Sequence, residues 1–243
     1  EAKSVIKDFN FSTLLTTQNE GDLTFPRSSI KVFQAIPFIL SNAHIKFSLN
    51  QKNIAISCAS HAGENQHLII LKKWIKNIDL KINKLLCGSH NPINLQSSNN
   101  LLLSGVLPNQ LHNNCSGKHL GMISGCLARK IQIDNYVDYN HPYQKIIQNI
   151  LEEFMGYKIK KKNIGIDGCS APQYAFPLVN LADSMISLLR IKEKKNNYAN
   201  AMNTLLNSIL KYPLVIGGTD RFDSMVMQIT KGRIFCKGGA EGI

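Results

Sequence analysis

Apolar residues recur every three or four positions in four stretches of the chain, the spacing that places them on one face of an α-helix. The stretches are 33–40, 68–78, 146–154 and 202–209. Pro142 is suited to the first turn of the third helix and Gly156 to its end, while Pro213 follows the fourth. Helices therefore dominate the predicted fold.

Strand-like segments are fewer and shorter. Residues 53–57 resemble a strand, and residues 225–229 and 233–236 resemble a hairpin that turns at Lys231-Gly232. We therefore predict a protein in which helices dominate, with a small mixed or antiparallel sheet. A chain of 243 residues is long enough to bury the core of one such domain, spanning 1–243.

Four loops of small residues, between the periodic segments, concentrate polar chemistry. They are residues 57–64, 113–119, 167–172 and 217–223. Glycine, serine, asparagine and charged residues do not build cores in this way, whereas loops on a rigid scaffold commonly carry functional side chains. The four loops are the candidate site.

The net charge of +12 raises the question of a nucleic-acid partner. The lysines are spread along the chain, and the densest clusters, 158–162 and 192–195, fall where loops between helices are expected. Aromatic residues make up only 7% of the chain and do not interleave with basic ones. We interpret the charge as a lysine-rich surface and predict no nucleic-acid partner.

Two observations bear on the compartment. No run of 18 apolar residues is present, and residues 1–10 lack the apolar core of a signal peptide, so we predict no membrane association. The six cysteines form no C-x-x-C pair and are too sparse for a disulfide-stapled domain. Reduced cysteines favour the cytoplasm.

Ser28 and Lys31 are three residues apart at a predicted helix start, which places both side chains on one face. A neutral lysine amine there can accept the serine proton and activate the oxygen as a nucleophile. Serine and lysine have the same spacing at 4–7 and 208–211, so the motif alone is weak. Pro26 and the apolar helix after Lys31 favour Ser28.

Ser60 lies in the loop that follows the predicted strand at 53–57. Its hydroxyl is a candidate second nucleophile or oxyanion donor. The alternative is a turn serine that caps the next helix, although Ser60 and Glu64 do not match the spacing of a capping box.

Cys115 and Cys169 lie in two of the polar loops, and cysteine is a common zinc ligand. The histidines available to complete a site include His61, His67, His112 and His119. The alternative is that both cysteines are small buried apolar residues. Arg221 is a candidate clamp for a substrate carboxylate, or else half of a surface ion pair.

Taken in order, six stretches resemble the asparaginase II family, typified by rhizobial inducible asparaginases. The matching stretches are 27–37, 57–67, 112–122, 165–172, 221–223 and 237–242. Each motif is weak alone, but six in the same order are specific. The resemblance implies a fold like that of serine β-lactamases and glutaminases, an α/β protein of the α+β sandwich type with a helical part and a small, mostly antiparallel sheet. It also implies hydrolysis of L-asparagine to aspartate and ammonia, by a homodimer.

The resemblance also implies roles for individual residues. Two serine–lysine pairs carry over by position, Ser28 with Lys31 and Ser60 with Lys237. The family's zinc site falls on Cys115, Lys118 and Cys169. The substrate-binding positions carried over are Arg27, His119, Asp167 and Arg221. On this basis we expect Ser28 to be the nucleophile and Lys31 its base.

The chain also departs from the family pattern. Ser170 and Asp220 stand where glycine is expected. Family members usually begin with a further strand and continue past the Gly-Ala-Glu-Gly segment at 239–242, so strands are expected to be missing at both ends. Unpaired strand edges favour aggregation, and we expect a longer version to be more stable.

Competing interpretations explain part of the same pattern. A β-lactamase or penicillin-binding enzyme shares Ser-x-x-Lys, but the chain has no S-D-N or K-T-G element. Residues 217–219 resemble part of the threonine asparaginases, yet they lie far from the N-terminus and lack the second threonine motif. The motifs are also compatible with a glutamine-directed hydrolase or an inactive, basic binding module, and an ammonia-release assay separates enzyme from module.

Overall fold

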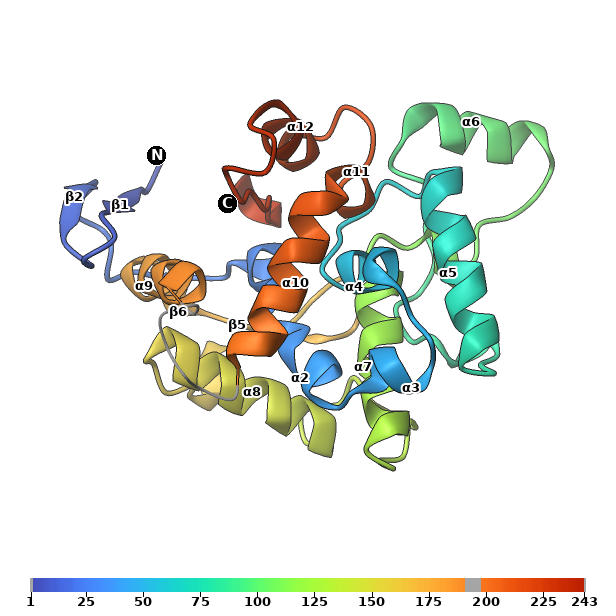
Figure 1. Ribbon diagram of the computed structural model, residues 1–243, viewed down its shortest axis with the longest axis horizontal. Coiled ribbons are helices and arrows are strands. Elements are labelled where there is room, and N and C mark those ends of the chain that lie inside the picture. The colour runs from blue at the N-terminus through green and yellow to red at the C-terminus, as the bar shows by residue number, and fades with distance from the viewer. Residues whose placement is uncertain (1, 191–197, 243) are drawn as a thin grey trace.

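The computed structural model describes residues 2–190 and 198–242, and it has the predicted α+β character, with helices in the majority (Figure 1). The α-helices are α1 (Lys31–Gln34), α2 (Ile36–Leu40), α3 (Ala43–Lys46), α4 (Gln51–Ser57), α5 (Asn65–Asn77), α6 (Leu95–Leu103), α7 (Ser116–Ala128), α8 (Pro142–Met155), α9 (Leu178–Leu189), α10 (Ala199–Lys211), α11 (Pro213–Ile216) and α12 (Phe222–Ile229). Short 3₁₀ helices are η1 (Arg27–Ile30), η2 (Ile82–Lys84), η3 (Gln110–His112), η4 (Lys161–Asn163) and η6 (Ala240–Gly242).

The strands of the described residues form three separate antiparallel pairs rather than one sheet. The pairs are β1 (Val5–Lys7) with β2 (Thr13–Thr16), β3 (Leu23–Thr24) with β6 (Phe176–Pro177), and β4 (Ile164–Ile166) with β5 (Pro172–Tyr174). The β1–β2 hairpin lies at one end of the molecule and α6 at the other (Figure 1). The antiparallel pairing is as predicted.

The core is centred on α7, whose residues 116–126 are all buried. Helix α4 packs directly against it, because Gly117 has no side chain: a Cβ there would lie 2.1 Å from the carbonyl oxygen of Ile56. The close approach brings the loop after α4, which holds Ser60, beside the loop before α7, which holds Cys115. Packing of these two helices therefore builds one wall of the site.

Most of the predicted helices are confirmed. Residues 142–155 form α8, which ends at Gly156 in the left-handed conformation at a φ of 57°. Residues 199–211 form α10, which stops before Pro213, and residues 65–77 form α5. The predicted 33–40 helix is divided into α1 and α2 at Ala35, where Pro37 lacks the N–H that a continuous helix would use.

The strand predicted at 53–57 is wrong, because these residues belong to helix α4. Asn50 accepts hydrogen bonds from the backbone of Lys52 and Asn53, and the Asn53 side chain accepts one from the Asn50 N–H, which forms a capping box. Residues 53–57 are buried on all sides. A short apolar run that is buried all round has no periodicity with which to distinguish helix from strand.

The hairpin predicted at 225–236 is also wrong. Residues 222–229 form α12, and the segment 233–236 is not a strand. Lys231 and Gly232, with φ of 50° and 73°, end the helix, since the Gly232 N–H donates to the Met227 carbonyl at 2.8 Å. A Lys-Gly pair with positive φ is compatible with the end of a helix as well as with a hairpin turn, so the pair alone did not distinguish the two.

Three further expectations concern the chain as a whole. No helix in residues 2–190 and 198–242 is long and apolar enough to cross a membrane. All six cysteines are free thiols, as predicted. The lysine cluster at 158–162 lies between α8 and β4, as expected, whereas the cluster at 192–195 lies outside the described residues.

Candidate active site

A cavity of about 590 Å³ collects residues from all four polar loops. Its lining includes Ser28, Ser60, Asn113, Cys115, Asp167, Cys169, Arg221 and Asp223. These residues are far apart in sequence, so the fold brings together the side chains that were singled out by residue type alone. The glycine-rich segment 238–240 closes one side of the cavity.

The Ser60 hydroxyl lies between two lysines. The Nζ of Lys31 donates to Ser60 Oγ at 3.0 Å and to the Ala59 carbonyl at 2.5 Å. The Nζ of Lys237 donates to the same Oγ at 3.3 Å. The predicted contact between Ser60 and Lys237 is therefore present, and Lys31 donates to the same hydroxyl.

Lys237 is buried beside a carboxylate. Its Nζ lies 3.3 Å from Asp223 Oδ2 and 2.8 Å from the Gly238 carbonyl. Burial lowers the pKa of Lys237 to about 8, Lys31 adds to the shift, and Asp223 offsets part of it. A lysine with this pKa is neutral far more often near neutral pH than an ordinary lysine, and a proton acceptor has to be neutral.

Ser28 lines the same cavity and is half-buried, and it lies in the 3₁₀ helix η1 that precedes α1. Among the described residues its hydroxyl forms no hydrogen bond with Lys31, whose amine is directed to Ser60 instead. Arg27, immediately before it, has a φ of 47°, which is uncommon for a residue with a side chain. Backbone strain of this kind is often found at functional sites.

Three metal-ligating atoms, from Cys115, Asp167 and Cys169, lie in the same cavity, all within 4.8 Å of one another. Lys118 Nζ lies 3.1 Å from Cys169 Sγ, and Lys31 Nζ lies 3.2 Å from Cys115 Sγ. Two thiol sulfurs and an oxygen at this spacing suit a small thiophilic cation such as zinc. The predicted cysteines are thus together, with Asp167 as a third donor beside Lys118.

The two thiols differ in acidity. A hydrogen bond from Cys115 and the charge of Lys118 lower the pKa of Cys169 to about 5, although burial opposes the shift. The same hydrogen bond and burial raise the pKa of Cys115 to about 12. Burial opposes the charged form of Lys118, but Cys169 and Cys115 raise its pKa above the usual value. Lys118 therefore has to lose a proton before it can bind a metal.

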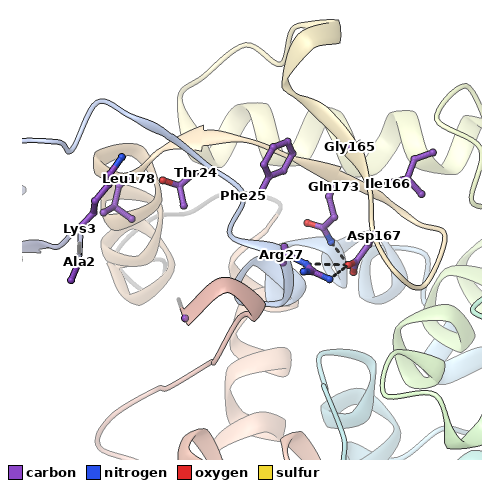
Figure 2. A pocket seen from close by; sticks show the side chains of 11 residues that line it. Ala2, Lys3, Thr24, Phe25, Arg27, Gly165, Ile166, Asp167, Gln173 and Leu178 are labelled. Carbon is purple, nitrogen blue, oxygen red and sulfur yellow. Dashed lines mark hydrogen bonds and ion pairs between the residues drawn. The ribbon is translucent and has the colours of Figure 1, made fainter. Parts of the chain in front are cut away.

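Arg27 and Asp167 form an ion pair across the cavity wall, with Nη2 2.7 Å and Nε 3.2 Å from the same carboxylate oxygen. Gln173 donates to the other oxygen at 3.3 Å, as Figure 2 shows. Burial opposes ionisation of Asp167, but Lys118 and Arg27 lower its pKa. The pair also borders a second cavity of about 720 Å³.

A family model described as L-asparaginase II matches residues 2–243, nearly the whole chain. The chain belongs to the L-asparaginase II family. The family consists of amidohydrolases that act on asparagine, so a cavity that holds a serine hydrogen-bonded to two lysines is consistent with membership. A comparison with curated proteins gave no match.

In this L-asparaginase II member the remaining two predicted site residues occupy different environments. Arg221 is exposed and lines the cavity, and within the described residues its guanidinium forms no ion pair. His119 is fully buried behind the cavity, where its Nδ1 lies 2.6 Å from the Tyr136 hydroxyl. Burial lowers the pKa of His119 to about 3. Arg221 is thus open to a ligand, whereas His119 has no exposed surface and does not line the cavity.

The residue types alone did not reveal several supporting contacts. Asp223 forms an ion pair with Lys237, and the side-chain oxygen of Asn113 accepts a hydrogen bond from the Cys115 N–H at 2.9 Å. Glu64 accepts the Thr219 N–H at 2.6 Å and so ties two polar loops together. All three supporting residues, Asp223, Asn113 and Glu64, lie in matched stretches, 221–223, 112–122 and 57–67, and this position was the signal available in the sequence.

The two departures from the family pattern occur at strained positions. Ser170 has a φ of 66° and Asp220 a φ of 59°. The left-handed region is easy for glycine and uncommon for other residues, although aspartate is among the more tolerant. The backbone therefore adopts the conformation for which glycine is expected at both positions, despite the side chains.

Proposed function

We propose that the protein hydrolyses the side-chain amide of L-asparagine to L-aspartate and ammonia. The observation that carries the proposal is the chain of hydrogen bonds from Lys31 through Ser60 to Lys237, in a cavity that Ser28 also lines. Family membership supplies the class of substrate. Arg221, exposed at the same cavity, supplies a positive charge for the α-carboxylate of the substrate.

Ser28 is the proposed nucleophile. Its half-buried hydroxyl is open to the cavity, whereas Ser60 is 7% exposed and already bound by two lysines. Attack of Ser28 Oγ on the amide carbon forms a C–O bond. The proton removed from Ser28 is passed to the amide nitrogen as the C–N bond breaks, which releases ammonia, and water then hydrolyses the ester to aspartate and restores the Ser28 hydroxyl. Lys31 is one turn away, and catalytic hydrogen bonds often shorten only when substrate is bound.

The Lys31–Ser60–Lys237 chain is the proposed path for protons. Lys31 takes the Ser28 proton, and Ser60 can accept from one lysine while it donates to the other. Lys237, with a pKa lowered to about 8 by burial, can exchange a proton near neutral pH. Ser60 is therefore assigned to proton transfer rather than to attack.

The function is tested by ammonia release from L-asparagine and, in parallel, from L-glutamine. We expect turnover of asparagine with a kcat/KM at least about tenfold above that of glutamine, because one methylene is worth roughly one to three kcal/mol in a fitted pocket. Ammonia release from glutamine alone would reassign the substrate. No release from either, by folded protein, would favour a binding module over an enzyme.

A zinc ion is proposed at Cys115, Lys118 and Cys169, with Asp167 as the alternative third protein ligand. Bound there, zinc would supply a fixed positive charge at the cavity wall. We expect elemental analysis to find about one zinc per chain, because thiolates bind zinc tightly. Cys169→Ser should lose the metal.

Cys126→Ser is the matched control, since Cys126 is fully buried and is not part of the ligand group found among the described residues. It should retain zinc. Lys118→Met and Asp167→Asn then identify the third ligand, because only the true ligand reduces the zinc content. Stoichiometric zinc after loss of both Cys115 and Cys169 would refute the site.

A homodimer and a cytoplasmic location are part of the same proposal. The homodimer follows from the family resemblance, and the location from six free thiols. Substrate is proposed as the small-molecule partner.

A further inference from the structure

Helix α6 presents its apolar side chains to solvent. The helix lies wholly within the described residues, and none of its side chains is buried. Leu95, Leu102 and Leu103 are 74%, 78% and 86% exposed, and the turn that follows adds Val106 and Leu107 at 56% and 84%. Figure 1 shows α6 at the edge of the molecule, away from the helices of the core. We call these five residues the α6 patch.

The α6 patch is one surface rather than scattered residues. Positions 95, 102 and 103 are separated by seven and eight residues, so they share one face of the helix. Ser97, Ser98 and Leu101, all half-buried, occupy the inward side. An amphipathic helix whose apolar face is directed outward is typical of an interaction site.

Local hydrogen bonds hold the helix in this position. Asn94 caps it by accepting the Ser97 N–H at 2.8 Å, and Gln96 donates to Asn100 at 2.8 Å along one side. The Asn94 N–H donates to the Ala62 carbonyl at 3.0 Å, which anchors the helix start beside the Ser60 loop. These contacts position α6 while the side chains of the α6 patch stay exposed.

Charge argues for the identity of the partner. Residues 85–117, which include α6, contain no Lys, Arg, Asp or Glu, in a chain of net charge +12. Two copies of so basic a protein repel one another, and the repulsion is weakest where neither surface carries charge. An acidic protein, a nucleic acid or an anionic membrane would find no basic residue on α6 to bind.

We propose that the α6 patch is the surface through which two copies of this chain associate. In a two-fold symmetric dimer the same patch occurs on both copies, and an uncharged apolar stripe can pack against itself. This inference locates the contact of the proposed homodimer and is independent of the proposed reaction. Asparagine and glutamine between the leucines supply hydrogen bonds at the rim.

The test is sedimentation velocity of the full chain and of Leu102→Glu over about a hundredfold range of concentration. We expect the wild type to dimerise and the variant to have a dimer dissociation constant at least about tenfold higher, because it buries a charge in an apolar contact. Ile45→Glu is the matched control, since Ile45 on α3 is 68% exposed and outside the α6 patch. It should dimerise like the wild type.

The outcomes separate the two proposals. A folded Leu102→Glu variant that dimerises as tightly as wild type would overturn the α6 contact while the homodimer stands. A wild type that stays monomeric throughout would overturn both, and ammonia release would still test the reaction. If Leu102→Glu fails to fold, hydrogen exchange of wild-type amides 95–103 decides: protection that rises with concentration supports the contact, and unchanged protection refutes it.

Discussion

Ser28→Ala is expected to lose turnover of L-asparagine by about 10³-fold or more, as happens when a nucleophile is removed. The substitution deletes only the hydroxyl of a half-buried residue, so the fold should persist. The rate is measured by ammonia release at saturating substrate. The proposed ester intermediate gives a second measurement, because mass spectrometry of rapidly quenched enzyme should find an aspartyl group on the peptide that contains Ser28.

Ser29→Ala is the control for this variant. Its hydroxyl donates to the Pro26 carbonyl at 2.8 Å and the residue is buried away from the cavity. It should retain most of the activity. Near-normal turnover by folded Ser28→Ala protein would sink the assignment and make Ser60 the nucleophile, and an aspartyl group on a Ser60 peptide would do the same.

Ser60→Ala is expected to lower kcat by about 10² to 10⁴-fold, the usual contribution of positioned proton transfer. The hydroxyl joins Lys31 and Lys237, and no other atom of residue 60 replaces it. The zinc content should be unchanged. Ser57→Ala, which removes a buried hydroxyl bound only to its own helix and to Cys58, is the matched control.

The pH profile separates proton transfer from a structural role for Ser60. A proton acceptor acts when it is deprotonated, so wild-type kcat should rise with pH and level off above the pKa of Lys237, about 8. The Ser60→Ala variant cuts the link to Lys237, and the residual rate should no longer follow this rise. A variant with lowered activity but the wild-type profile would contradict the proposed path.

Much of the helical structure could be predicted from residues that lie close together in the sequence. Helices α8 and α10 were predictable because Pro142, Gly156 and Pro213 mark their ends and their apolar residues recur at helical spacing. Helix α4 was not predictable, because residues 53–57 are all buried and a short run of this kind has no periodicity that distinguishes a helix from a strand. Lys231-Gly232 was ambiguous in the same way, since positive φ ends a helix or turns a hairpin.

The candidate site divides along similar lines. Residue type and order identified Ser28, Ser60, Lys31, Cys115 and Cys169, because each belongs to a matched stretch with chemistry of its own. What each side chain contacts depends on helix packing. The amine of Lys31 donates to Ser60, 29 residues further along the chain, and the sequence spacing does not reveal this contact.

By itself the sequence determined the helical character, the four polar loops and the membership in an amidohydrolase family, because capping, periodicity and residue order are local properties. The tertiary structure alone decided that Ser60 lies between two lysines, that Asp223 supports Lys237, and that α6 faces outward. These features depend on contacts between residues far apart in the chain. Such contacts are set by burial and close packing, which act on the folded chain as a whole.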